Sequence, residues 1–300
     1  MRKVKRTRLI VIILAMVLVV NAGLVGYSMI GGNLPVSDKN SSDNSEKTTV
    51  INKNTQKPKT ADNGLKDEAS TEISKEILDL IKAQDPDSYT KNLNNYKQQL
   101  ELLNVHVKFK NEIERLIKKG KKLPDILIAY SFLNDCYGGM EDVENLVDKN
   151  ESGKKWPDIF KEYYKNNPEF VPRDFESDYL ERLLDSGTNQ DTIMIADRVS
   201  QKTKVEIDIL ISKKQAGESW RLINAEYGIV NGSEKSPHLS VTRTQLTKYT
   251  TQTNLSEKEV INALTIATKL GKSADSVLNS VKKGLSKEVI YAMAFEEKYY

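Results

Sequence analysis

The sequence reads GKKWPDI at residues 153–159, and the same pattern returns as GESWRLI at residues 217–223. In each copy the tryptophan and the isoleucine are three residues apart, so they share one face of a helix that begins after the glycine. We interpret the pattern as packing, because a large ring at the start of a short helix can hold that helix against its neighbour. The alternative is an aromatic platform for a ligand such as a sugar.

The two copies belong to a longer internal repeat with a spacing of 64 to 67 residues. The chain aligns on itself as three units, at about 110–170, 177–237 and 243–300. The third unit has Lys287 in place of the tryptophan, and its opening helix matches the others poorly. The residues that we expect to pack the units recur at equivalent positions: Gly120, Gly187, Ile126, Ile193, Val260, Ala129, Ala196, Ala263, Gly153, Gly217, Gly284, Trp156, Trp220, Ile159, Ile223 and Ile290.

These units predict an all-α fold. Each has an opening helix, a helix with Ile-x-x-Ala or Val-x-x-Ala, a third helix that stops at a glycine, and a short final helix. No alternating strand pattern with hairpin turns occurs in this part of the chain. Short connections favour antiparallel neighbours, so we expect stacked helical hairpins in a solenoid-like array or an irregular bundle. Residues 71–109 continue the helical period and predict an N-terminal cap.

The repeat resembles helical-repeat segments of uncharacterised, membrane-anchored proteins from AT-rich Gram-positive bacteria. The resemblance rests on the two tryptophan motifs and the Ile-x-x-Ala helices, and it covers about 190 residues. It implies a helical, membrane-anchored protein and carries no catalytic residue over to this chain.

The positive charge of the chain is concentrated at its N-terminus. The whole sequence has a net charge of +3, and residues 1–8 alone hold +5, so the remainder is −2. The five cations, which we interpret as topogenic, are Arg2, Lys3, Lys5, Arg6 and Arg8. They precede the uncharged stretch 9–32, whose 24 residues are enough to cross a bilayer as one helix. We therefore expect a single-pass membrane anchor with residues 1–8 in the cytoplasm.

A cleaved signal peptide is the competing interpretation of residues 9–32. Small residues near Ala22 fit a cleavage site, and cleavage would make the protein secreted. Apolar residues continue beyond that point and favour an uncleaved signal-anchor. Residues 33–70 contain no aromatic side chain and balance six lysines with six acids, which predicts a disordered linker. In either case the body lies outside the cytoplasm.

The residue inventory argues against several chemistries. Two histidines, His106 and His238, and one cysteine, Cys136, offer little for a metal site or a nucleophile, so we expect neither metal nor cofactor. The pair Gly138-Gly139 is interpreted as a turn between helices rather than a phosphate loop. Residues 255–284 imitate a helix-turn-helix, but the extracytoplasmic topology and the lack of net positive charge argue against nucleic-acid binding.

Two functional hypotheses remain. The first is a non-enzymatic module that binds a protein or a cell-wall partner outside the membrane. The second is an envelope hydrolase or lyase that uses one carboxylate in a helical cleft. Neighbouring acids such as Glu141/Asp142/Glu144 or Asp174/Glu176 could in principle serve glycosidic cleavage, although most acids on a helical surface are simply solvated. A buried acid with a raised pKa beside a groove would favour the second hypothesis.

Overall fold

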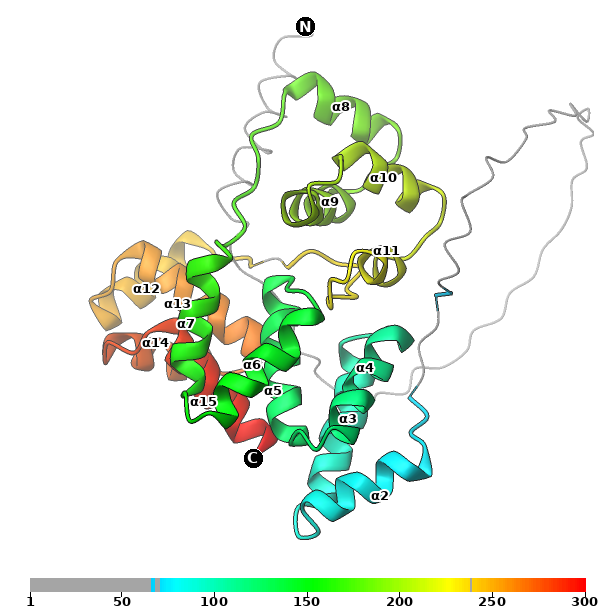
Figure 1. Ribbon diagram of the computed structural model, residues 1–300. Helices are drawn as coiled ribbons and strands as arrows, with labels where there is room; N and C mark the ends of the chain where they lie inside the picture. Colours follow the sequence, from blue (N-terminus) through cyan, green and yellow to red (C-terminus); the bar gives the residue numbers. More distant parts are fainter. Residues whose placement is uncertain (1–65, 68–70, 238) are drawn as a thin grey trace, which may run out of the picture.

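The computed structural model describes residues 66–67, 71–237 and 239–300, and every regular element within them is an α-helix. The predicted all-α class is confirmed for this part of the chain (Figure 1). The helices are α2 (Lys75–Gln84), α3 (Tyr89–Leu102), α4 (Val107–Lys118), α5 (Leu123–Cys136), α6 (Glu141–Glu151), α7 (Trp156–Asn166), α8 (Ser177–Asp185), α9 (Gln190–Thr203), α10 (Ile207–Gln215), α11 (Trp220–Glu226), α12 (Arg243–Thr253), α13 (Glu257–Leu270), α14 (Ala274–Lys282) and α15 (Lys287–Tyr299).

The expected cytoplasmic tip 1–8, with its five cations, and the expected membrane helix 9–32 lie outside the described residues, as does nearly all of the linker 33–70. Among the residues that are described, none of the helices combines the length and the apolar character that crossing a bilayer requires.

Left-handed residues end the helices at regular intervals. The opening helices α4, α8 and α12 are followed by Gly120, Gly187 and Asn254, whose φ angles are +85°, +82° and +60°. These three positions are 67 residues apart, and asparagine tolerates the left-handed region better than most residues with a side chain. The third opening helix, which matches the others poorly in sequence, therefore ends at an equivalent left-handed residue, Asn254, that a search for glycine does not find.

The apolar residues singled out in the repeat are buried. Trp156 and Trp220 are at most 1% exposed, and neither ring has a free face for a ligand. The remaining large members (Ile126, Ile159, Ile193, Ile223, Val260 and Ile290) and the three alanines are buried as well. The repeat glycines have a different role, because a Cβ atom added at any of the five would meet nothing within 4 Å. Their requirement is the positive φ angle of the helix stop.

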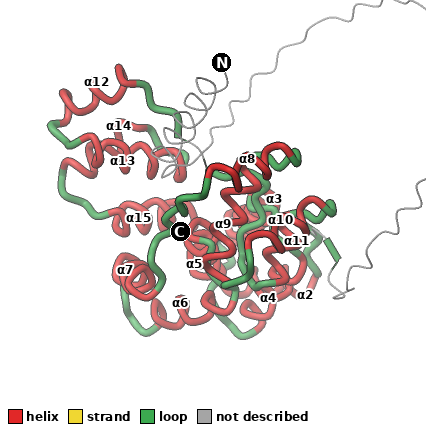
Figure 2. Tube along the Cα trace, turned by 90° about the horizontal axis from the view of Figure 1, so that it is seen from above, coloured by secondary structure: helices red, strands yellow, loops and turns green. Residues whose placement is uncertain are grey.

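Two hydrophobic cores divide the body. One core joins α2–α7 to α12–α15, and the other lies within α8–α11 with Tyr137 added from the end of α5. Figure 1 shows α8–α11 as a group above the remaining helices, and Figure 2 shows α12–α14 away from that group, with α15 beside α7. We call α2–α7 the first helix group, α8–α11 the second and α12–α15 the third. In a linear solenoid the third group would pack on the second. Here it packs on the first, so the arrangement is an irregular bundle.

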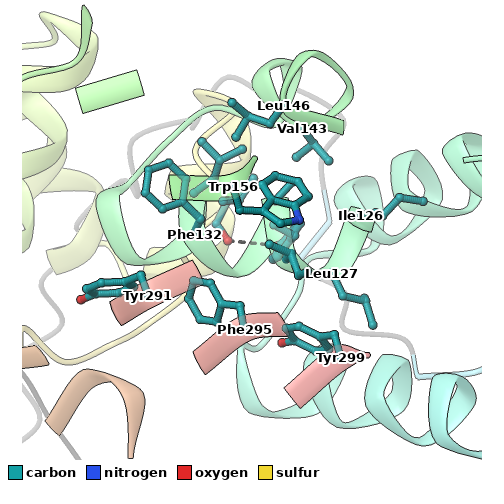
Figure 3. Packing of buried hydrophobic residues seen from close by; sticks show 14 of the residues in the cluster. Ile126, Leu127, Phe132, Val143, Leu146, Trp156, Tyr291, Phe295 and Tyr299 are labelled. Atoms are coloured by element: carbon teal, nitrogen blue, oxygen red, sulfur yellow. Dashed lines mark hydrogen bonds between the residues drawn. The ribbon is translucent and has the colours of Figure 1, made fainter. Parts of the chain in front are cut away.

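Helix α15 makes the connection between the first and third groups, because it packs against both α5 and α7. Its residues Tyr291, Phe295 and Tyr299 lie opposite the aromatic and aliphatic side chains of α5 and α7 (Figure 3). Phe132 and Phe160 stack with ring centroids 4.0 Å apart, and Phe295 meets Phe160 edge-on at 6.3 Å. Such aromatic contacts add to the stabilisation from buried area.

A short backbone bridge joins the first and second groups. Met140 N donates a hydrogen bond to Gly228 O at 2.8 Å, and Val230 N donates to Gly138 O at 3.1 Å. The pair Gly138-Gly139 does lie between two helices, as expected of a turn, and it also forms this isolated bridge with Ile229. A Cβ atom at Gly138 would come within 2.4 Å of Leu133 Cδ2 and 2.8 Å of the Tyr163 hydroxyl, so a side chain here would displace residues of α5 and α7.

Candidate functional site

A cleft of about 780 Å³ lies where the three helix groups meet. Its walls are one face of α9, one face of α13, the end of α7 with the segment that follows, and the start of α15. On α9 the lining residues Met194, Arg198 and Lys202 are spaced four apart, and on α13 Lys258, Asn262 and Ile266 repeat that spacing. Residues at this spacing share a helix face, so each helix turns one continuous stripe toward the cleft.

The cleft is strongly basic. Six cations and two acids line it, a net charge of +4, in a chain whose sequence after residue 8 has a net charge of −2. Both acids are already paired, since Asp135 accepts from Lys269 at 2.9 Å and Glu169 from Lys287 at 2.6 Å. The four cations that have no carboxylate partner within the described residues are Arg198, Lys202, Lys204 and Lys258.

Arg198 lies close to two aromatic rings. Its guanidinium carbon lies 4.1 Å from the centroid of Tyr137 and 5.5 Å from that of Phe170. One Nη2–H group donates to the backbone oxygen of Asp135 at 3.2 Å, and Nε is buried with no hydrogen-bond partner. Stacking on aromatic faces fixes the plane of a guanidinium, so the direction of its remaining donors is set in advance.

Other cations of the cleft also lie over rings. The Lys287 ammonium is 3.7 Å from the centroid of Tyr164, and that of Lys202 is 5.7 Å from the centroid of Tyr163. Lys202 Nζ also donates to the neutral Asn167 Oδ1 at 2.7 Å. Burial raises the pKa of Tyr163 and Tyr164 well above the usual range for a phenol, so both stay neutral and add no negative charge.

Cys136 lines the same cleft without being a suitable nucleophile. Burial raises the pKa of its thiol to about 12, with a further contribution from the Asp135 carboxylate. Its sulfur donates weakly to Leu133 O at 3.6 Å. Because the thiolate is the reactive form, this cysteine is chemically quiet at neutral pH.

The acids do not form the arrangement that a carboxylate-dependent hydrolase requires. Burial raises the pKa of Asp125, but this residue accepts from the Tyr300 hydroxyl at 2.6 Å and does not line the cleft. Asp197 is fully buried and paired with Arg173, also outside the cleft. Glu144 bonds to Lys119 and Arg115, which lower its pKa to about 2. Glu176 precedes α8 and likewise has no place in the cleft.

The histidine and metal expectations concern other parts of the chain. His106 caps α4 by accepting from Lys108 N at 3.1 Å, and its second ring nitrogen lies 2.8 Å from Lys66 O. His238 is outside the described residues. Over the described ranges, no group of three or more histidine, cysteine, aspartate or glutamate side chains could hold a metal ion.

The apolar residues predicted from the repeat are buried in the cores, the predicted glycines end helices at exposed positions, and none of the predicted residues lines the cleft. The sequence did contain one signal for the cleft that the repeat analysis missed. Arg198 and Lys258 both sit on helices with no acid three or four residues away in either direction, so neither has the intrahelical partner that surface cations often have. No family model, curated protein or solved structure matches this chain.

Proposed function

We propose that this chain is a non-enzymatic, membrane-anchored binding protein whose body lies outside the cytoplasm and whose cleft holds an acidic partner from the cell envelope. The single observation that carries the proposal is the set of four cations in one cleft that have no carboxylate partner among the residues that the structure describes. Like charges gathered in a cleft repel one another and attract an oppositely charged ligand, so such a concentration favours binding of an anion.

The sequence supports the location. Residues 9–32 are long and apolar enough for one membrane helix, and the five cations before them favour a cytoplasmic N-terminus. The linker 33–70 would then separate the body from the membrane surface as a stalk. The three predicted units at 110–170, 177–237 and 243–300 would together build the cleft, and the 67-residue spacing of the left-handed helix stops supports them as copies of one unit.

The binding proposal is tested with the full-length, tagged protein and a charge-reversed variant, Lys202→Glu with Lys258→Glu. We expect the unmodified protein to retain an acidic protein or polymer from solubilised envelopes and to release it as salt is raised, because ion pairs at a surface are screened. The control carries Lys91→Glu with Lys97→Glu, which makes the same charge change on α3, away from the cleft. Equal retention by all three proteins would rule the cleft out.

The location has a separate test. Protease added to intact protoplasts should digest a tag placed after residue 300, while a cytoplasmic marker protein survives. A protected tag would overturn the proposed orientation without bearing on the cleft.

A further inference from the structure

Among the four cleft cations without a carboxylate partner in the described residues, Arg198 is the one that is partly buried, whereas Lys202, Lys204 and Lys258 are exposed. Among the described residues the buried Nε atom of Arg198 has no hydrogen-bond partner, and the single hydrogen bond of the guanidinium goes to a neutral backbone oxygen. A guanidinium has five N–H donors, and withdrawing a charged group from water costs free energy unless the charge is paired. Nη1 has no described partner, so its donors remain available to a group that enters the cleft.

The nearby acids are committed elsewhere. Asp135 offers Arg198 only its backbone oxygen, because its carboxylate accepts from Lys269. Asp197, the preceding residue, bonds to Arg173 through both the backbone and the side chain. The carboxylate of Glu169 accepts from Lys287. Within the described residues none of these three carboxylates pairs with the Arg198 guanidinium, so its charge is available to an anion that enters the cleft.

The number of cleft cations without a carboxylate partner in the described residues indicates the charge of the anion that the cleft would bind. Lys202 lies one turn after Arg198 on the same face of α9, and Lys258 reaches the cleft from α13. A carboxylate carries one negative charge, whereas a phosphate monoester carries about 1.5 to 2 at neutral pH and has three acceptor oxygens. Arginine with its planar fork is well matched to such oxygens, and lysine supplies additional point charges.

We propose that the cleft binds a phosphate group, with Arg198 donating to its oxygens through Nη1 and the remaining N–H of Nη2, and Lys202 and Lys258 neutralising its charge. The inference rests on the proposed function, since it names the ligand class of the same cleft. The phosphate could belong to a small phosphomonoester or to a phosphodiester polymer; in the polymer each phosphate carries one negative charge, so successive phosphates would supply the charge that a single monoester supplies alone.

The test is calorimetric titration of the full-length protein with glycerol phosphate, with an oligomeric glycerol phosphodiester, and with oligoglutamate of matched length as the carboxylate probe. We expect at least one phosphate probe to bind, and the stronger of the two identifies the source. Arg198→Ala should weaken that binding by about a hundredfold and Arg198→Lys by about tenfold, because lysine keeps the charge but loses the fork and the stacking.

The matched control is Arg182→Ala, which removes an arginine that also lies over a tyrosine ring, 5.7 Å from Tyr179, but outside the cleft. It should leave the affinity unchanged. A second readout guards against misfolding, because bound phosphate should raise the unfolding midpoint of the wild type and Arg182→Ala but not of Arg198→Ala. Equal phosphate affinity in wild type and Arg198→Ala would overturn the inference.

The outcomes also separate this inference from the proposed function. Binding of oligoglutamate without binding of either phosphate probe would overturn the phosphate assignment and leave an acidic partner in place. Failure of all three probes, together with equal retention of envelope material by the charge-reversed variant, would overturn both.

Discussion

The Tyr299 hydroxyl lies 2.7 Å from Ser131 Oγ, and this hydrogen bond joins α15 to α5 across 168 residues of sequence. Both residues are buried, and Ser131 also donates to Gln99 Oε1 on α3 at 3.3 Å. Three helices that are distant in the sequence therefore meet at one polar contact inside an apolar core. A buried hydrogen bond of this kind fixes which faces of the helices pack together.

Removing the Tyr299 hydroxyl should lower stability by a modest and measurable amount. We expect Tyr299→Phe to reduce the free energy of unfolding by about 1 kcal/mol, the net contribution of a typical hydrogen bond. Tyr299→Ala should cost about 3–5 kcal/mol, because it also leaves a cavity. Urea denaturation of these variants, of Ser131→Ala and of the double variant Ser131→Ala/Tyr299→Phe measures the coupling. Strict additivity of the two single changes would contradict a direct interaction.

The two tryptophans should report on different cores. Trp156 lies in the core shared by the first and third helix groups, and Trp220 lies in the core of α8–α11. Trp156→Ala should therefore increase amide hydrogen exchange in α4–α7 and in α12–α15 together, at a cost of about 3–5 kcal/mol. Trp220→Ala should increase exchange in α8–α11 and affect α12–α15 least. If each substitution increased exchange only in helices adjacent to it in the sequence, the helices would instead form a linear stack.

Asp125 should make stability depend on pH in the acid range. Burial raises its pKa above 3.8, so the folded chain favours the protonated carboxyl. The resulting stabilisation is fully present below the unfolded pKa and is lost as the pH rises through the folded pKa. Asp125→Asn should thus be more stable than wild type at pH 7, and the difference should shrink toward about pH 3.5.

The control for Asp125 is Asp158→Asn, measured by the same urea denaturation series. Asp158 occupies the same position in α7 that Asp125 occupies in α5, third from the start of a helix with proline second, but it is exposed. Asp158→Asn should not gain stability at pH 7, because the helix dipole stabilises a negatively charged, exposed side chain in the first turn. Parallel pH profiles for the two variants would contradict the role of burial.

Cys136 should react slowly in the folded protein. With a pKa of about 12 against an unperturbed value of 9.0, the thiolate fraction near pH 8 is lower by about a thousandfold. We expect iodoacetamide to label the denatured chain within minutes and the native chain far more slowly, with Cys136→Ser as the background. The native labelling rate should still be rising at pH 10, where the rate for the denatured chain has levelled off. If the labelling rate of the native chain levelled off near pH 9, the pKa of the thiol would be unperturbed and the prediction would be wrong.

The sequence was sufficient for the helical class and for several helix ends, because both are local properties. Helical periodicity predicted the all-α fold, and glycines such as Gly153 mark helix stops through their backbone conformation alone. The equivalent stop at Asn254 was missed, since asparagine serves many other purposes in a sequence.

The cleft could not be predicted in the same way. Arg198, Lys258 and Lys287 belong to three different helices, and only tertiary packing brings them to one site. The net charge of the chain does not reveal them, because the surplus of acids elsewhere cancels the local charge of +4 in the cleft. The packing of α15 on α5 depends on contacts between residues such as Ser131 and Tyr299, which no periodicity relates.

The place of α15 in the first core also bears on biosynthesis. Because α5 and α7 bury their apolar faces against a helix that ends at Tyr299, the ribosome must release almost the whole described chain before this core can close. Contacts so distant in sequence slow folding and leave intermediates with exposed apolar surface. Until then the nascent α2–α7 segment exposes apolar surface that α15 will later cover, which makes it a suitable client for a holding chaperone.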